Sequence, residues 1–310
     1  MKQAQGWTFT SLMVALALAS VLLMLSVKTV VFSLGATRQT IQLAQLHQSG
    51  QFMLNLLQHE LRNGNFMAGA QSLQQMNPPL SVDNDCQSSA DAGSFPVLNQ
   101  PFQLLRTGTV GAADAPACLA NALRDTDYLQ IKRLAGDPTV KAAIRQNRVY
   151  LSHSGERASF VTVDSTELLA DATYWPYLHQ IFYISRQQQQ GRQIPVLMRK
   201  RLVRQQNGLL VMDTDSVLDG VEAMVFEIGL DSNQDGVTDE FSTQAIDNIW
   251  NGGPISSNVV QIRFHLLLRS VEPDPAYTNT QQYQLGPRRF DAPGDHFRRL
   301  QLSSSVTFIN

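Results

Sequence analysis

A long apolar segment near the N-terminus dominates the hydrophobic pattern of the chain. No Asp, Glu, Lys or Arg occurs from Gln3 to Val27, and residues 7–27 are mostly apolar. A helix of about 21 residues is roughly 30 Å long, which is enough to cross the hydrocarbon core of a bilayer. Lys2 precedes the segment, so the positive-inside rule places the chain start in the cytoplasm and everything after Lys28 outside.

Three interpretations of this segment are open. A cleaved secretory signal needs a short apolar core and a small-residue site, and Ala15-Leu16-Ala17 and Ala17-Leu18-Ala19 satisfy that rule locally. The apolar run nevertheless continues to Leu25, which is unusual for such a signal. An uncleaved signal anchor is the second interpretation. The third interpretation rests on the six residues that precede the segment, which end in Gly6.

The helix is predicted to continue well beyond the membrane. Arg38 and Glu60 are the only charged residues between Lys28 and Leu61, and no proline occurs between Trp7 and Asn65. A single helix to about Arg62 would be roughly 80 Å long. Gly35 and Gly50 are local weak points, and Asn63-Gly64-Asn65 is a stop signal. Apolar residues recur at a three-four spacing, which predicts an amphipathic face, at Leu46, Met53, Leu54, Leu57 and Leu61.

The rest of the chain is predicted to form a β-rich head. Residues 67–118 show no clear period and predict a long loop region with short elements. Short hairpin-sized gaps between the strands imply an antiparallel sheet, whose apolar face the long helix would cover. The fold class is therefore α+β. The expected strands are 128–131, 148–151, 180–185, 195–203, 209–212, 221–230, 259–268 and 300–309.

Cys86 and Cys118 are the only cysteines of the chain. A head outside the cytoplasm meets oxidising conditions, which favours a disulfide between them. It would close a loop of about 30 residues and contribute on the order of 3 kcal/mol in the chain-entropy model. Two free buried thiols are the alternative, and two cysteines are too few for a four-Cys zinc site.

The N-terminus resembles a type IV prepilin. A short leader ending in Gly6 precedes an aromatic residue, Trp7, and then a long apolar helix. This resemblance implies cleavage after Gly6 by prepilin peptidase and N-methylation of Trp7. It divides the chain into a leader (1–6), a transmembrane part (7–28), an amphipathic part (29–62) and a head (63–310). The family usually has Glu at the fifth mature position, whereas this chain has Ser11. In that family, the carboxylate pairs with the terminal amine of a neighbouring subunit. A subunit without the carboxylate suits a filament tip. The alternative is that this ion pair matters little in minor subunits.

A second resemblance is to PilW-type minor pilins. The stretch 219–231, DGVEAMVFEIGLD, is similar to their GVE-M-F-YG-D stretch. Residues 56–62 resemble their helix end, and residues 297–300 and 303–306 resemble their last strand. The J pseudopilins of type II secretion share the architecture. The resemblance implies a minor pilin in a pilus tip or priming complex. Its partners would be other minor pilins, the major pilin, prepilin peptidase and the inner membrane. The head would be periplasmic at first and would later lie on the pilus.

One segment has the spacing of a calcium loop. Oxygen-bearing side chains alternate at Asp231, Asn233 and Asp235, and Gly236 permits a sharp turn. Hard oxygen ligands at this spacing suit a structural Ca²⁺. The twelfth position is Ser242 instead of the usual Glu, and an Asp/Asn/Gly-rich turn without metal is the alternative. The predicted ligands are Asp231, Asn233, Asp235, the Val237 carbonyl, Asp239 and Glu240.

The sequence contains no sign of an enzyme. HExxH, GxSxG, Walker and GxGxxG patterns do not occur, and the six histidines are scattered. The net charge of −2 argues against a dominant nucleic-acid-binding role. A basic run at 199–204 is the one candidate contact for DNA or an acidic subunit, and a solvated strand face is the simpler reading. The alternative to a pilus or pseudopilus subunit is a membrane-anchored periplasmic enzyme or binding protein.

Overall fold

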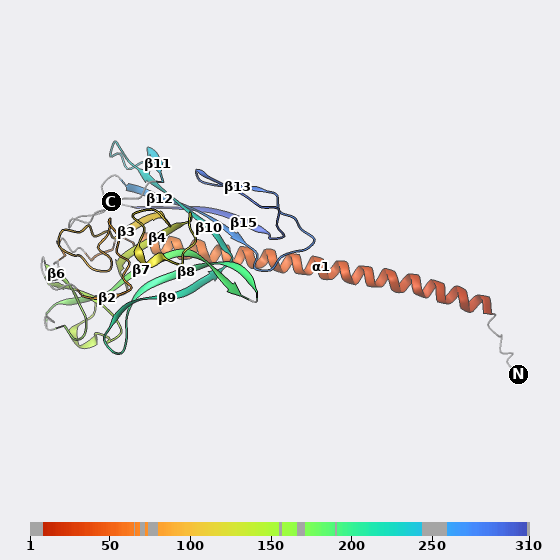
Figure 1. Ribbon diagram of the computed structural model, residues 1–310, viewed down its shortest axis with the longest axis horizontal. Coiled ribbons are helices and arrows are strands. Elements are labelled where there is room, and N and C mark those ends of the chain that lie inside the picture. The colour runs from red at the N-terminus through yellow and green to blue at the C-terminus, as the bar shows by residue number, and fades with distance from the viewer. Residues whose placement is uncertain are drawn as a thin grey trace.

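The computed structural model describes residues 9–64, 66–68, 72–73, 80–154, 157–165, 171–189, 191–243 and 259–308, with the backbone alone at 72–73, 154 and 157. Within these ranges the chain forms one long helix and a head of largely antiparallel sheets. The predicted α+β class is therefore confirmed. Figure 1 shows the helix as a rod whose first half projects from the head.

Helix α1 (Phe9–Arg62) is continuous over 54 residues. It passes through Gly35 and Gly50 without interruption, because no proline removes a hydrogen bond from the backbone ladder. It ends where expected. Asn63 Nδ2 donates a hydrogen bond to the His59 carbonyl at 2.8 Å, and the Gly64 amide donates to the Leu61 carbonyl at 3.1 Å. These bonds satisfy carbonyls that the end of a helix leaves free.

The larger sheet is built on a long meander. The predicted hairpin is formed by β7 (Thr173–Gln189) and β8 (Arg192–Arg204), and β9 (Leu210–Asp219) pairs antiparallel with β8 after the turn at Gly208. Gly208 has a φ of 88°, which a glycine adopts without strain. The remaining strands are β1 (Ser72–Leu73), β2 (Val82–Asp83), β3 (Leu105–Thr109), β4 (Asp127–Leu134), β5 (Tyr150–Ser154) and β6 (Arg157–Val161).

The smaller sheet has the order β11-β10-β12-β15. β10 (Val221–Leu230) has the predicted bounds, and β12 (Val259–Arg269) pairs antiparallel with both β10 and β15 (Arg299–Thr307). β11 (Glu240–Ser242) continues the sheet beyond β10. A separate hairpin of β13 (Gln282–Leu285) and β14 (Arg288–Asp291) lies on this side of the head. The head thus has two main sheets where a single sheet was expected.

The C-terminal half of α1 packs into the core between these two sheets. Met53, Leu57 and Leu61 are fully buried, as the three-four spacing predicted. They share one apolar cluster with Phe182 of the larger sheet and Phe264 of the smaller one. A helix held from both sides in this way is a rigid part of the head.

A second apolar core lies on the opposite face of the larger sheet. Every residue of β4 is buried, because Leu129 belongs to the core around α1 while Tyr128 belongs to the second core. Phe95 and Phe102, from the predicted loop region, cover this second face and stack edge-on with Phe160. The loop region is therefore a packed layer of the head, and β3 within it pairs with β4.

Candidate assembly surface and predicted sites

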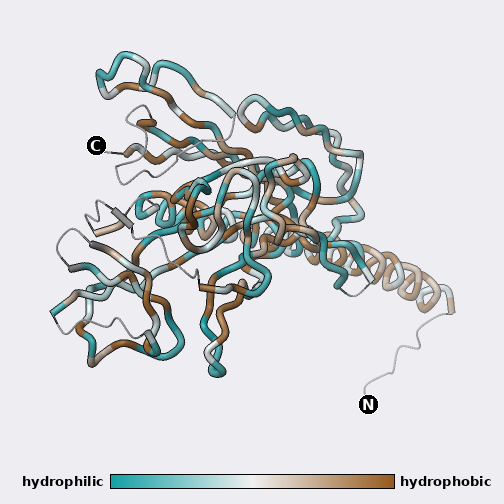
Figure 2. The backbone as a smooth tube through the Cα atoms, turned by 60° about the vertical axis from the view of Figure 1, so that its left-hand side comes forward, coloured by the Kyte–Doolittle hydropathy of each residue, from teal (hydrophilic) through white to brown (hydrophobic). Residues whose placement is uncertain are grey.

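The first half of α1 is an exposed apolar surface. Its large apolar side chains are solvent-exposed from Phe9 to Leu34, with 73% of Phe9 and 79% of Phe32 accessible. Figure 2 shows this hydrophobic rod outside the head. Among the described residues, α1 is the one helix long and apolar enough to cross a membrane. An apolar surface of this size is stable only in lipid or against other apolar helices.

Three hydroxyl side chains of this rod donate hydrogen bonds to the backbone of the helix itself. The hydroxyl of Ser20 donates a hydrogen bond to the Ala17 carbonyl at 2.8 Å. Ser26 and Thr29 donate to carbonyls four residues earlier, each at 2.9 Å. Hydroxyls bonded in this way need no water, so the rod tolerates an environment without hydrogen-bonding solvent.

The second half of α1 joins the rod to the head. Gly50 lies where α1 meets β15, and a Cβ at this position would collide with the Leu302 side chain. At the end of the helix, Glu60 Oε2 accepts hydrogen bonds from Arg133 Nε at 3.0 Å and from Gln180 Nε2 at 3.2 Å. All three residues are buried. The close approach and the buried ion pair fix the direction in which the rod leaves the head.

The predicted processing residues, Gly6 and Trp7, lie outside the described residues. Ser11, at the position where prepilins usually have Glu, lies in the first turn of α1.

The predicted calcium loop forms a compact turn between β10 and β11. The Asp231 carboxylate accepts amide hydrogen bonds from Gln234 at 2.6 Å and Gly236 at 2.7 Å. Asp239 Oδ2 accepts the Ser232 amide at 2.8 Å. Within the described ranges, no three acidic, His or Cys side chains are grouped closely enough to hold a metal ion. Further bonds within the turn involve Asn233, Asp235 and Val237, and Glu240 is exposed at the start of β11.

A structural Ca²⁺ in this loop stays a proposal, with a direct test. We expect calcium to raise the unfolding temperature of the protein relative to chelator, because an ion that binds only the folded state stabilises it, by about 2.7 kcal/mol at a hundredfold excess over Kd. Asp235→Ala should abolish the shift, whereas Asp213→Ala, at an exposed acid on β9, should leave it intact. Identical melting curves with calcium and with chelator would contradict the proposal.

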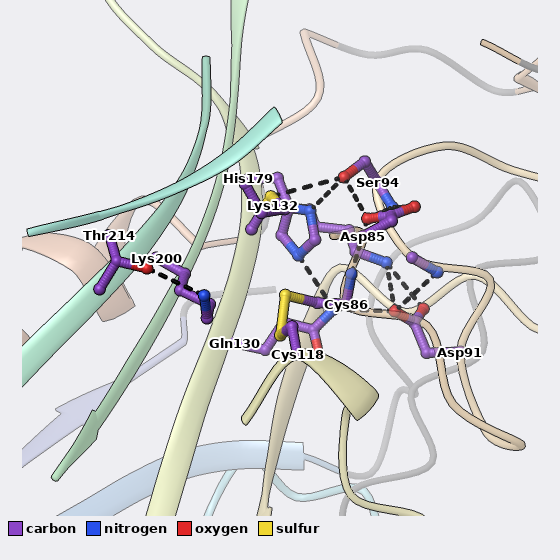
Figure 3. The surroundings of a disulfide bond; sticks show 12 residues. Asp85, Cys86, Asp91, Ser94, Cys118, Gln130, Lys132, His179, Lys200 and Thr214 are labelled. Carbon is purple, nitrogen blue, oxygen red and sulfur yellow. Dashed lines mark hydrogen bonds and ion pairs between the residues drawn. A yellow bond between two sulfur atoms is a disulfide. The ribbon is translucent and has the colours of Figure 1, made fainter. Parts of the chain in front are cut away.

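Cys86 and Cys118 form a disulfide. Next to it lies a set of polar residues, all buried except the half-buried Asp85, which we call the buried polar cluster (Figure 3). Lys132 Nζ lies 2.7 Å from both carboxylate oxygens of Asp91, and both side chains are completely buried. Asp91 also accepts the Gln130 side-chain amide at 2.8 Å. Burial lowers the pKa of Lys132, which the adjacent Asp91 carboxylate opposes. The cluster comprises Asp85, Asp91, Ser94, Gln130, Lys132 and His179.

Ser94 is within hydrogen-bond distance of both Asp85 and His179, yet the three residues do not form a nucleophilic triad. The Ser94 hydroxyl donates to Asp85 Oδ1 at 2.7 Å, so the contact with His179 Nδ1 at 2.9 Å requires the imidazole to be the donor. Such a histidine cannot take the proton of Ser94. Burial, followed by the charge of Lys132, holds the pKa of His179 well below its usual value, so the ring is neutral. The cluster therefore attaches the loop region to the sheet.

The basic run on β8 is largely neutralised. Arg199 pairs with Asp215 of β9 at 2.6 Å, and Lys200 donates a hydrogen bond to Thr214 at 2.9 Å. Arg204 pairs with Asp164. A DNA contact requires basic groups that are free to meet phosphates. Within the described residues, Arg201 is the one member of this basic run without a side-chain hydrogen bond or an ion pair.

These features define an α+β protein in which an exposed apolar helix, a candidate membrane anchor, is rigidly attached to a β-rich head. Residues 181–310 match the family model of type IV pilus-assembly protein W (PilW). This segment contains most of the β7–β8 hairpin, β9 and the entire smaller sheet, so the expected PilW-type resemblance is confirmed there. The match covers less than half of the chain, so it shows similarity to this family over the C-terminal part of the head. No curated protein and no solved structure matches it significantly.

Proposed function

We propose that this protein is a minor pilin, a structural subunit that takes part in assembling a type IV pilus. The observation that carries the proposal is the exposed apolar rod of α1, fixed to a head whose C-terminal part matches a pilus-assembly family. In the precursor, the rod would hold the protein in the inner membrane with the head in the periplasm. During assembly, the same surface would become part of a shared helical bundle.

The residue types of α1 suit this transfer. Lipid tails and packed apolar side chains are similarly apolar, so helices associate in a bundle through close packing and satisfied polar groups. The self-bonded hydroxyls of Ser20, Ser26 and Thr29 carry no unmet hydrogen-bonding demand into either environment. Between Lys28 and Glu60, the single charge at Arg38 limits the cost of removing this helix from water.

A position at the tip or in the priming complex is the finer part of the proposal. In prepilin-like subunits, the carboxylate expected at position 11 would pair with the terminal amine of a neighbour. Ser11 offers no carboxylate, so this subunit requires no such neighbour ahead of it. The same helix would also serve a J-type pseudopilin of a secretion machine. The family match to a pilus-assembly protein favours the pilus.

Mass spectrometry of the native protein tests the proposal. We expect the mature chain to begin at an N-methylated Trp7 and to co-purify with sheared pili at a few copies per filament. An antibody against the head should label filament ends. An intact Met1 together with absence from pili would contradict the pilin assignment and favour a plain membrane anchor. Labelling along the shaft would contradict only the tip position, and a secretion defect with normal pili would favour the pseudopilin.

A further inference from the structure

A cavity with both apolar and charged lining residues lies at the junction where α1 leaves the head. Its volume is about 380 Å³, within the range of small-molecule sites, roughly 300–1,000 Å³. One wall is the helix from Arg38 to Ser49, and the other is formed by residues 268–273, which are the end of β12 and the segment after it. Gln42 Nε2 donates to the Glu272 carbonyl at 3.3 Å and connects the two walls.

The cavity presents both signs of charge. Arg38 and Arg269 contribute two cations, and Asp219 and Glu272 contribute two carboxylates. Ile41 and Leu46 provide an apolar strip along the helix wall. Two atoms of the lining residues are also buried without a hydrogen-bond partner, namely Oε1 of Gln42 and Nε of Arg269. A ligand with both an anionic and a cationic hydrogen-bonding group matches this lining.

The cavity also lies at the level of the chain where lipid headgroups are expected. From Phe9 to Ala36, α1 contains one charged residue, Lys28, and is about 42 Å long at 1.5 Å per residue. That length equals the thickness of a bilayer with its headgroup regions, about 40–45 Å. Arg38 follows directly, so the opening of the cavity would meet the outer surface of the membrane.

We propose that this cavity binds the headgroup of a zwitterionic phospholipid with a primary ammonium group, the phosphoethanolamine class. The proposal rests on the membrane anchoring proposed above. The phosphate would pair with Arg38 and accept a hydrogen bond from the unpartnered Nε of Arg269. The ammonium would donate to Asp219, to Oε1 of Gln42 and to Glu272, whose carboxylate otherwise pairs with Arg192. A choline headgroup has no N–H to donate, and a glycerol headgroup lacks the cation, so neither satisfies both halves of the site. Such a lipid would hold the head against the membrane until the subunit enters a filament.

Lipid retention by the full-length protein tests this inference. The protein is reconstituted in nanodiscs of equal parts phosphatidylethanolamine, phosphatidylcholine and phosphatidylglycerol, extracted in mild detergent and examined by native mass spectrometry. We expect preferential retention of phosphatidylethanolamine. Arg38→Gln and Glu272→Gln should each lower its retention about tenfold, the loss expected for one charge-assisted hydrogen bond. Both side chains are exposed outside the core, and near-ultraviolet circular dichroism verifies the fold.

Arg192→Gln is the matched control. Arg192 pairs with Glu272 at 2.6 Å but does not line the cavity, so this variant breaks the same ion pair and leaves the site intact. It should retain the lipid at least as well as the wild type. Equal retention of all three lipids would overturn the inference. A photo-cross-linker placed at position 42 would also overturn it if it reacted only with a neighbouring subunit and never with lipid. Flotation with liposomes separates the two proposals, since a protein that floats without retaining the lipid contradicts only this one.

Discussion

Replacing Asp91 by Ala is expected to lower the free energy of unfolding by about 3–5 kcal/mol, because it leaves the buried Lys132 ammonium without its counter-charge. Lys132 is completely buried and contacts both oxygens of Asp91 at 2.7 Å. Its nitrogen also lies 4.0 Å from the centre of the Phe102 ring, a contact that is lost if the lysine loses its proton. Burial already lowers the pKa of Lys132, so the unpaired lysine would deprotonate or unfold its surroundings.

A double-mutant cycle separates the pair from its context. Asp91→Ala with Lys132→Met should cost less than the sum of the two single changes, because no unpaired charge stays buried. Asp291→Ala is the control. It removes a pair with Arg289 in which both side chains are more than half exposed, and the expected loss is at most about 1 kcal/mol. The stabilities of the two single variants, the double variant and the control are measured by urea unfolding of the full-length protein in detergent, followed by tryptophan fluorescence. An additive cycle would show that Asp91 and Lys132 are not energetically coupled.

The helix and the principal strands were predictable because their signals are local. The absence of proline and the three-four spacing of Met53, Leu57 and Leu61 specify a helix and its buried face. Alternation specifies β10 with its observed bounds, and Gly208 specifies the turn before β9. Each of these signals lies within a window of about a dozen residues, the scale on which hydrophobic periodicity is informative.

The division into two sheets could not be predicted in the same way. The pairing of β12 with β10 and β15, but not with β8, depends on which apolar faces enclose α1. That choice is a property of packing across the whole head. The sequence of β4 is similarly ambiguous, because Gln130 and Lys132 alternate with Leu129 and Ile131 as in a strand with one solvated face. In the structure, the loop region covers that polar face, so all of β4 is buried.

The buried polar cluster escaped prediction for the same reason. Its members come from segments up to 94 positions apart, and each residue alone resembles an ordinary surface residue. The one local signal was the position of the cysteines. A disulfide from Cys86 to Cys118 encloses Asp91 and Ser94, so it marks the loop region as an ordered layer. A long segment without periodicity in a compact domain is more often packed or functional than structureless.

Removing the disulfide is expected to lower the free energy of unfolding by about 3–4 kcal/mol, from the closure entropy of a loop of about 32 residues. The loop region contains mainly short elements, so the folded state holds it through side chains and through this bond. Without the bond, the unfolded chain has more conformational entropy, which favours unfolding. The folded loop region has few backbone hydrogen bonds that could compensate for this gain. The change is Cys86→Ala with Cys118→Ala, and urea unfolding of the full-length protein under oxidising conditions is the measurement.

Reduction of the wild type provides the internal control. Dithiothreitol should bring the wild type to the stability of the double variant and leave the variant unchanged. Because Cys86 is completely buried beside Phe95 and Phe102, the loss should appear first as proteolysis within residues 80–118, while the helix packed between the two sheets stays protected. A reduced protein that loses less than about 1 kcal/mol would mean that the buried polar cluster alone holds this layer. The disulfide would then protect the subunit only in the period before the cluster forms.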